Sequence, residues 1–150
     1  MFSKTIEYAL RAVIYIARNS SESKKIGLVE IANAIDSPQP FTAKILQVLT
    51  RDDQVICSVR GPHGGFYINE KQKALPVIAV LRTVEEETKL EKCVLGLAEC
   101  TESRPCPLHD EYKSIKKQLL RLFEQKTISD LVNKDSINST FISNRKRKGA

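Results

Sequence analysis

One stretch decides the fold of this chain: residues 39–68, QPFTAKILQVLTRDDQVICSVRGPHGGFYI. Its first part, residues 40–52, has the apolar spacing of an amphipathic helix. Residues 54–59 alternate as a strand should, and a second apolar strand follows at residues 66–68. The turn between the strands, residues 60–65, is rich in glycine and contains one proline, which is typical of a hairpin. A helix pair followed at once by a β-hairpin makes a winged helix-turn-helix, so this stretch predicts its second helix and its wing.

Three elements are expected before this stretch. Apolar residues at three-four spacing predict an amphipathic helix over residues 4–18 and a short helix over residues 29–35, with a short strand at residues 26–28 between them. The sequence DSP at residues 36–38 ends the short helix and can cap the next one. The two helices flanking this break are the expected helix-turn-helix.

The second helix of the pair has an apolar side and a mixed polar and basic side. Its expected buried residues are Phe41, Ile45, Val48 and Leu49. The residues expected to point outward are Gln39, Thr42, Ala43, Lys44, Gln47 and Arg51. Helices that read DNA have such a polar and basic face, and a plain helical hairpin with solvated charges is the alternative.

A long helix is expected near the end of the chain, after a short helix over residues 76–84. Its apolar residues recur at spacings of four, three, four and three: Leu108, Tyr112, Ile115, Leu119 and Leu122. This is the seam of a helix that packs against another long helix, and the copy in a homodimer is the expected partner. A further short helix is predicted at residues 128–132.

The predicted fold class is therefore mainly α with a small β-hairpin wing. Residues 1–82 are expected to form a winged helix-turn-helix domain, and residues 83–134 a cysteine loop and a long C-terminal dimerisation helix. Residues 135–150 lack periodicity and end in a run of basic residues, so a disordered basic tail is expected there.

Three cysteines and a histidine gather on one segment: Cys93, Cys100, Cys106 and His109, separated by six, five and two residues. Thiolates and imidazole are ligands for iron–sulfur clusters and for zinc. A structural zinc site usually begins with a tighter pair of cysteines, so this spacing favours a loose loop around a larger cluster. Three unrelated buried cysteines are the alternative, although their neighbours are mostly polar and charged.

The fourth cysteine, Cys57, belongs to a different part of the chain. It falls in the predicted strand over residues 54–59, where Val55, Cys57 and Val59 are expected to share one face. An inward position on a strand assigns Cys57 to the core and not to the group of metal ligands.

The net charge of +6 is unevenly distributed. Residues 1–82 hold 11 Lys and Arg against 7 Asp and Glu, residues 83–135 hold 9 against 11, and residues 136–150 hold 4 against none. A basic front favours a polyanionic partner. No run approaches the roughly 20 apolar residues of a membrane span, and Glu7 and Arg11 interrupt the N-terminal apolar run, which argues against a signal peptide. The expected compartment is a reducing cytoplasm, with no membrane partner.

Four segments carry a family resemblance: YALRA at residues 8–12, SVRGPHGGF at 58–66, the cysteine loop at 93–109 and TISDLV at 127–132. Together, over roughly residues 1–134, they resemble the Rrf/IscR/NsrR family of bacterial winged-helix transcription regulators. The resemblance implies a bacterial cytoplasmic homodimer bound to double-stranded DNA at a palindromic operator. One recognition helix per half-site would enter the major groove, and the wing would reach the adjacent minor groove.

The resemblance also implies which residues contact DNA. The recognition positions match Gln39, Phe41, Thr42, Ala43 and Lys44, with Arg51 as a further phosphate contact. In the wing, Arg60 matches the arginine that enters the minor groove, and the remaining wing positions are Ser58, Gly61, His63 and Gly64.

The resemblance further implies an iron–sulfur cluster held by Cys93, Cys100 and Cys106. In one branch of the family a histidine three positions after the last cysteine completes a 2Fe–2S site, and His109 matches it. In another branch a carboxylate from the partner's first helix completes a 4Fe–4S site, and Glu7 matches that position. Both ligands stay open at this point, with 2Fe–2S favoured over 4Fe–4S.

The expected function is that of a DNA-binding repressor whose operator affinity the cluster controls. The signal would be cluster status, redox state or nitric oxide. A winged-helix regulator with a structural zinc ion or with a thiol-based redox switch is the alternative, and an iron–sulfur carrier is a further one. No nucleophile and base stand out as a pair, so the chain is not expected to be an enzyme.

Overall fold

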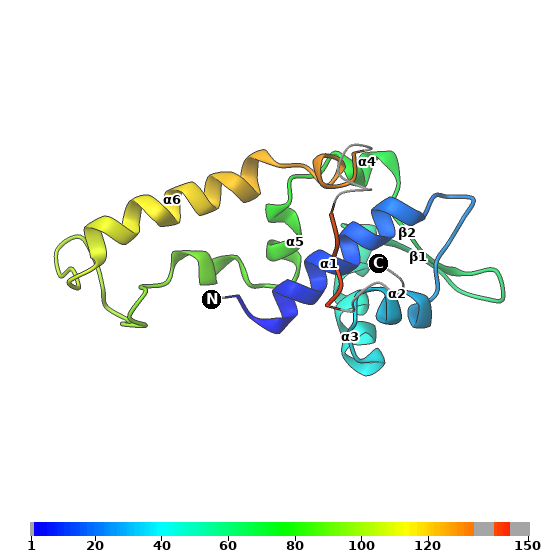
Figure 1. Ribbon diagram of the computed structural model, residues 1–150, viewed down its shortest axis with the longest axis horizontal. Coiled ribbons are helices and arrows are strands. Elements are labelled where there is room, and N and C mark those ends of the chain that lie inside the picture. The colour runs from blue at the N-terminus through cyan, green and yellow to red at the C-terminus, as the bar shows by residue number, and fades with distance from the viewer. Residues whose placement is uncertain (1, 134–139, 145–150) are drawn as a thin grey trace.

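Helix α1, Lys4–Asn19, runs through the middle of the molecule and contacts α2, α3, α5 and β2 (Figure 1). This arrangement is seen in a computed structural model, which describes residues 2–133 and 140–144. Ser3 begins α1, because its hydroxyl accepts a hydrogen bond from the backbone N–H of Ile6 at 3.2 Å. The buried side chains of α1 are Ile6, Ala9, Ala12, Val13, Ile16 and Ala17.

Helices α2, Leu28–Ala34, and α3, Gln39–Leu49, form the predicted helix-turn-helix and pack on α1 and on each other. Pro40 lies in the first turn of α3, where the N–H that proline lacks has no helical partner. Ile45, Leu46 and Leu49 are the buried apolar residues of α3. Leu46 is buried although this was not predicted. Phe41 and Val48, which were expected to be buried, are only half-buried.

Helix α3 ends three residues before the predicted end at Asp52. The hydroxyl of Thr50 donates to the Leu46 carbonyl at 2.7 Å, and a short 3₁₀ turn, η1 (Arg51–Asp53), follows. Asp52 and Asp53 have φ values of 53° and 49°, in the left-handed region where an α-helix cannot continue. Arg51 therefore lies in the turn and not on the helix.

Thr42 was expected on the outer face of α3, and this expectation is wrong. Its side chain is fully buried, and its Oγ1 lies 2.9 Å from the carbonyl oxygen of Pro38 and 2.9 Å from Oγ of Ser37. A buried hydroxyl needs such partners. Thr42 therefore ties the start of α3 to the turn that precedes it.

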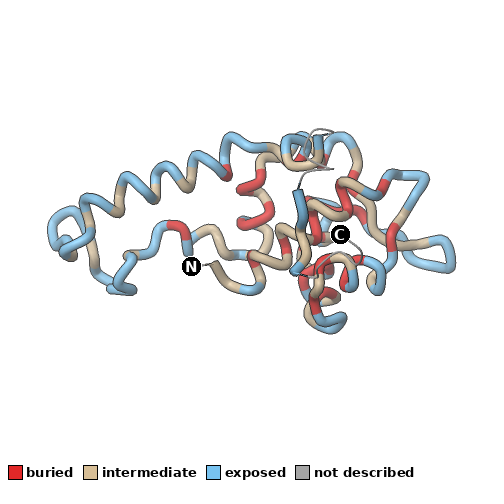
Figure 2. Tube along the Cα trace, viewed as in Figure 1, coloured by how far each residue is buried: buried red, intermediate tan, exposed pale blue. Residues whose placement is uncertain are grey.

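The wing is an antiparallel pair, β1 (Cys57–Val59) and β2 (Gly65–Tyr67), in which Cys57 lies opposite Tyr67. Ile26 adds one bridge to Phe66, in place of the expected strand at residues 26–28. The predicted inner face is wrong at Val59, which is 43% exposed. The reason is that the hairpin extends beyond the core after Cys57, so its outer residues have nothing to cover them (Figure 2). Cys57 is buried as expected.

After the wing come α4 (Glu70–Lys73), which was not predicted, and α5 (Ile78–Thr83), which was. The chain then leaves the domain through η2 (Glu87–Glu91) and the cysteine loop, and it returns along α6 (His109–Gln125). In Figure 1, α6 extends well away from the helix-turn-helix. Its exposed apolar residues include Leu108, at the N-cap, Ile115 and Leu122, at 42%, 55% and 51%.

The C-terminal end of α6 is fastened to the start of α5. The N–H of Val77 donates to the Lys126 carbonyl at 2.8 Å, and the N–H of Ile128 donates to the Leu75 carbonyl at 3.0 Å. The side chain of Ile128 is fully buried. A final 3₁₀ turn, η3 (Ser129–Leu131), stands where the short terminal helix was expected.

Part of the predicted basic tail lies against α1. Arg18 donates to Oγ1 of Thr140 at 2.8 Å, and Ile142 packs against the core, whereas Phe141 is 80% exposed. The basic run at residues 145–150 lies outside the described residues.

Replacing Thr42 by valine tests its structural role. Thr42→Val keeps the shape but leaves the Pro38 carbonyl and the Ser37 hydroxyl without this partner. We expect the free energy of unfolding to fall by about 1–3 kcal/mol, measured by urea denaturation. Gln47→Ala, at an exposed position of the same helix, is the control and should change it by less than about 0.5 kcal/mol. A Thr42→Val protein as stable as wild type would contradict this role.

Candidate nucleic-acid interface and metal centre

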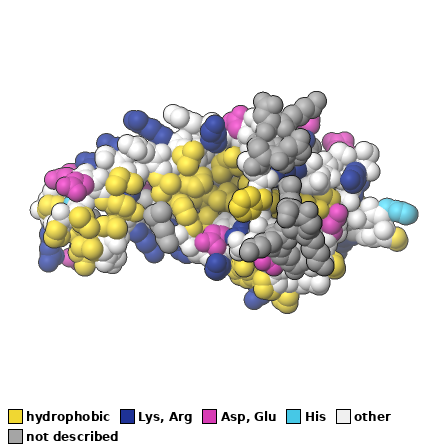
Figure 3. Space-filling view, in the orientation of Figure 1, with side chains coloured by type: hydrophobic (Ala, Val, Ile, Leu, Met, Phe, Trp, Pro, Cys, Tyr) yellow, Lys and Arg dark blue, Asp and Glu magenta, His cyan; other side chains and the backbone are white. Residues whose placement is uncertain are grey.

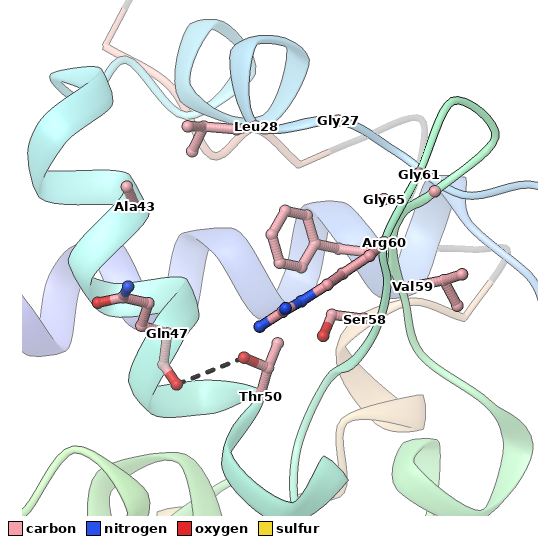
Figure 4. A pocket seen from close by; sticks show the side chains of 12 residues that line it. Gly27, Leu28, Ala43, Gln47, Thr50, Ser58, Val59, Arg60, Gly61 and Gly65 are labelled. Carbon is pink, nitrogen blue, oxygen red and sulfur yellow. Dashed lines mark hydrogen bonds between the residues drawn. The ribbon is translucent and has the colours of Figure 1, made fainter.

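A cleft of about 540 Å³ separates α3 from the wing (Figure 4). Three segments line it: the N-terminus of α2, the exposed side of α3 and the wing. Its residues are Gly27, Leu28, Ala43, Gln47, Thr50, Ser58, Val59, Arg60, Gly61, Gly64, Gly65 and Phe66. The side chain of Arg60 extends from the wing across the cleft toward Gln47 and Thr50 of α3 (Figure 4). The guanidinium of Arg60 thus lies between the wing and α3, where a negatively charged ligand could contact it.

The structure brings together five of the predicted DNA contacts in this cleft: Ala43, Ser58, Arg60, Gly61 and Gly64. Four further predicted contacts are exposed but do not line the cleft: Gln39, Lys44, Arg51 and His63. Thr42 is buried, as described above. Sequence reasoning missed Gly27 and Leu28 as lining residues, because only the bridge from Ile26 to Phe66 brings the start of α2 beside the wing.

Phe41 has a partner inside the protein. Its ring meets the ring of Tyr8 edge to face, with the centroids 5.5 Å apart, and Arg11 lies over the Tyr8 ring at 5.2 Å. Arg11 in turn donates to the carbonyl of Ile35 at 3.2 Å. These contacts fix the start of α3 on α1 and so set the direction of α3.

The tip of the wing requires glycine at position 64. The N–H of Gly64 donates to the Gly61 carbonyl at 2.9 Å, which closes the turn around Pro62 and His63. A Cβ atom at Gly64 would lie 2.1 Å from the Val59 carbonyl oxygen, far inside contact distance. The narrow tip therefore follows from backbone geometry, and it leaves His63 exposed at the end of the hairpin.

The three loop thiols meet as the sequence predicted. The Sγ atoms of Cys93, Cys100 and Cys106 all lie within 4.8 Å of one another. Cys93 and Cys106 are 3.6 Å apart, and Cys100 lies 3.2 Å from Nδ1 of His109. Two thiolates bound to one tetrahedral metal at about 2.3 Å lie roughly 3.8 Å apart, so the donor set fits a metal centre in type and in spacing.

Two turns shape the loop around these thiols. Gly96 takes a φ of 72°, and its N–H donates to the Cys93 carbonyl at 2.9 Å, which folds the chain back after the first cysteine. Thr101 and Arg104 exchange backbone hydrogen bonds of 3.2 and 3.1 Å and so bring the chain back between the second and third cysteines. The irregular backbone is what the glycine and the prolines predicted.

The thiols differ in acidity. Backbone N–H groups of Leu95 and Leu97 point at Cys93 and lower the pKa of its thiol to about 7. Burial raises the pKa of the Cys106 thiol. Of these two thiols, Cys93 is therefore the one more readily present as a thiolate near neutral pH, and the thiolate is the form that binds metals and attacks oxidants.

Two of the three thiols line an open groove. Cys100 and Cys106 line this groove of about 370 Å³ together with Leu97, Ala98 and Pro105. All three thiols also line a small cavity of about 20 Å³ against α6, which Tyr112 and Lys116 help to line. The groove therefore gives access to Cys100 and Cys106, whereas Cys93 is half-buried beside them.

The predicted ligand Glu7 is not among the metal-binding groups formed by the described residues of one chain. It lies in the first turn of α1, where it forms an ion pair of 3.0 Å with Lys4. A second group consists of Glu102, His109 and Asp110. Lys113 forms an ion pair with Glu102 and lowers the pKa of that carboxyl.

Apolar side chains gather at the loop and along α6. Val94, Leu95 and Leu97 of the loop are 46%, 51% and 53% exposed. Figure 3 shows hydrophobic side chains at this end of the molecule and between α6 and α1. None of the described helices is long and apolar enough to cross a membrane.

Comparison with known proteins places the chain among transcriptional regulators. Residues 2–134 match the model of the Rrf2 family, described as an iron-dependent transcriptional regulator. A protein of Aquifex aeolicus assigned by name to the HTH-type transcriptional regulators is 33% identical over 135 residues, which cover 89% of this chain and 92% of the relative. The HTH-type transcriptional regulator IscR of Erwinia tasmaniensis is 29% identical over 133 residues, 87% of this chain and 77% of the relative.

A solved structure confirms the winged-helix fold. CymR, the global cysteine regulator of B. subtilis, superposes with a TM-score of 0.68 at 19% identity, covering 88% of this chain and 95% of CymR. At this identity the likeness concerns the fold alone.

The acidity of Cys93 can be tested by alkylation. In reduced, metal-free protein we expect iodoacetamide to modify Cys93 faster than Cys106. The rate of modification of Cys93 should rise with pH and be half-maximal at about pH 7. The physical reason is that only the thiolate reacts, and the lowered pKa supplies it at neutral pH. Mass spectrometry of timed samples gives the rate at each site, and buried Cys57 is the internal control. Faster labelling of Cys106 would contradict the assignment.

Proposed function

The chain belongs to the Rrf2 family of transcriptional regulators, and from that we propose that it binds a palindromic DNA operator as a homodimer under the control of an iron–sulfur cluster. It is a regulator and not an enzyme. The cluster would be held on the loop by Cys93, Cys100 and Cys106, with repression of transcription as the expected outcome. The description of the family as an iron-dependent transcriptional regulator supports a metal-dependent function.

The observation that carries this proposal is the pairing of the four donor atoms. Cys93 lies beside Cys106, and Cys100 lies beside Nδ1 of His109. In a 2Fe–2S cluster each iron takes two protein ligands, and imidazole can replace thiolate on one iron. This pairing favours 2Fe–2S over 4Fe–4S and His109 over Glu7 as the fourth ligand.

When bound, the cluster would supply an iron centre that reacts with oxidants and nitric oxide. The ligands that the protein supplies come from two segments, the cysteine loop and α6, so the cluster would link these segments. His109 is the first residue of α6, and the three cysteines belong to the loop that precedes it. Ligation by both would fix the loop against the start of α6, and loss of the cluster would release it.

The far end of α6 leads back to the DNA-binding domain. Its last turn is hydrogen-bonded to the start of α5 through Val77 and Lys126, and α5 packs on α1 and α3. The exposed apolar seam of α6 suits a partner subunit, whose position would set the spacing of the two recognition helices. A coupling of about 1–3 kcal/mol between cluster and DNA would change operator affinity roughly 5- to 150-fold.

DNA would enter the cleft between α3 and the wing. Arg60 crosses this cleft, and Ala43 and Gln47 present the adjacent surface of α3. We assign Lys44 and Arg51, both exposed, to phosphate contacts, which add affinity without reading the sequence. The other proposed DNA contacts are Gln39, Ser58, Gly61, His63 and Gly64. Thr42 and Phe41 instead pack inside the protein and position α3.

A thiol switch is the second candidate, and one observation favours it. Cys93, with its pKa of about 7, lies 3.6 Å from the sulfur of Cys106. A peroxide could take two electrons from these thiols, and the products would be a Cys93–Cys106 disulfide and two waters. A structural zinc ion on the same thiols is a further alternative. Both alternatives give a colourless protein.

Metal content decides among these candidates. Protein purified without oxygen should be coloured and should contain roughly two iron and two sulfide per chain. His109→Ala should lose the colour, because the fourth ligand is gone, and Glu7→Ala should keep it. Cys57→Ser is the matched thiol control and should also keep it. A colourless wild-type protein, with zinc or with no metal, would overturn the cluster mechanism, and bleaching of Glu7→Ala would reassign the fourth ligand.

The role of Arg60 can be measured on DNA selected by the wild-type protein from a random-sequence pool. Arg60→Ala should weaken binding by roughly 1–3 kcal/mol, because it removes the cation that spans the cleft. Fluorescence anisotropy over a range of salt concentrations gives the affinity and its salt dependence. Arg82→Ala, on α5 and outside the cleft, is the matched control and should bind as wild type does. Equal affinities for both variants would contradict the proposed interface.

A further inference from the structure

The imidazole of His109 is almost enclosed, and its two nitrogens face different surroundings. The side chain is 11% exposed. Nδ1 lies 3.2 Å from the sulfur of Cys100. Nε2 is buried and has no hydrogen-bond partner within 3.5 Å among the described residues. A buried N–H without an acceptor is costly, so the neighbourhood of Nε2 is the place to look for a group that controls this ring.

The carboxylate of Glu102 lies in front of Nε2. Its Oε1 is 3.9 Å away, which is beyond hydrogen-bond length but within the range of an ion pair. Glu102 also pairs with Lys113, which lies one helical turn after His109 on the same side of α6. The same Oε1 atom of Glu102 thus lies near both the ring and a cation on the helix.

We propose that Glu102 is a positioning residue for His109: its carboxylate accepts the Nε2–H, which keeps the proton on Nε2 and the lone pair of Nδ1 directed at the metal. This inference rests on the proposed function, since it concerns a ligand of the proposed cluster. It adds a residue outside the set of ligands, and it assigns Nδ1 as the ligating atom.

The chemistry of imidazole supports the assignment. Neutral imidazole carries its proton on one nitrogen only, and the hydrogen bond made by that nitrogen determines which one it is. Metal-bound histidines commonly donate their other N–H to a carboxylate. Glu102 is 68% exposed, so its side chain has room to close the remaining distance of roughly 1 Å to hydrogen-bond length. A carboxylate offers two oxygens and can serve Lys113 and His109 at once.

Asp110 is the competing acceptor. Its carboxylate belongs to the same group of three as Glu102 and His109, in which the ligand atoms lie within 4.8 Å of one another. It follows His109 directly in the first turn of α6, where a carboxylate is also favoured by the helix dipole. The dipole accounts for Asp110 without any contact to the ring, whereas no helix terminus accounts for Glu102.

The test compares five substitutions in the full chain. Glu102→Ala removes the acceptor, Glu102→Gln keeps an acceptor oxygen without the charge, and Lys113→Met removes only the ion pair. Asp110→Asn tests the competitor, and Glu99→Ala is the matched loop control, because Glu99 pairs with Arg104 in the same exposed loop. Long-range ¹H–¹⁵N correlation spectra of the metal-free protein at about pH 8 report the tautomer of His109.

In wild type we expect the Nε2–H tautomer to predominate. Glu102→Ala should give a mixture with the Nδ1–H tautomer, whereas Glu102→Gln, Lys113→Met and Glu99→Ala should keep the wild-type spectrum. In cluster-loaded protein, Glu102→Ala should lose its visible absorption roughly 10-fold faster than wild type under air, and Glu102→Gln should restore most of the difference.

Three results would overturn the inference. The first is an unchanged tautomer of His109 in Glu102→Ala. The second is an equal effect of Glu102→Ala and Lys113→Met on the tautomer, which would show that Glu102 acts only as a surface ion pair. The third is a change of tautomer in Asp110→Asn alone. Failure of the proposed function is distinguishable, because it would appear as wild-type protein without a cluster, whereas the tautomer is measured on metal-free protein.

Discussion

The burial of α1 is the constraint on which the rest of the structure depends. The helix has Ile6, Ile16 and four smaller residues enclosed on all sides, and it contacts both helices of the helix-turn-helix, the wing and α5. Enclosing so much apolar surface is the main favourable term in folding. Because one helix supports all these elements, the position of α3 is set by packing on α1, with the edge-to-face contact of Phe41 against Tyr8 at its start.

The thiol cluster and the cleft between α3 and the wing are built differently. The cleft is shaped by regular elements and by Gly64 and Gly65, where a Cβ atom would lie 2.1 and 2.8 Å from backbone oxygens. The thiols lie on irregular backbone outside the core, and their meeting depends on two turns and on the first residue of α6. Under the proposed function the cleft would read DNA and the loop would act as the sensor, and irregular backbone suits the part that must rearrange.

Some expectations failed for local physical reasons. The periodicity of α3 continues past Leu49, but Asp52 and Asp53 adopt left-handed backbone, which periodicity does not report. Thr42 falls on a polar position of the helical pattern, yet its hydroxyl is satisfied by the preceding turn and is buried. Val59 continues the strand alternation although the hairpin has already left the core. In each case the residue pattern fits the predicted element, but contacts or backbone conformation in a neighbouring segment determine where the element ends or whether the side chain is buried.

The sequence by itself determined the winged helix-turn-helix, the long helix after the cysteine loop, the buried position of Cys57 and the grouping of Cys93, Cys100, Cys106 and His109. These follow from periodicity, from turn residues and from ligand types close together in the chain. Only the tertiary structure decided that Gly27 and Leu28 join the cleft, that Cys93 pairs with Cys106, and that Glu102 faces Nε2 of His109. Such relations depend on distances and directions between segments, and a one-dimensional pattern contains neither.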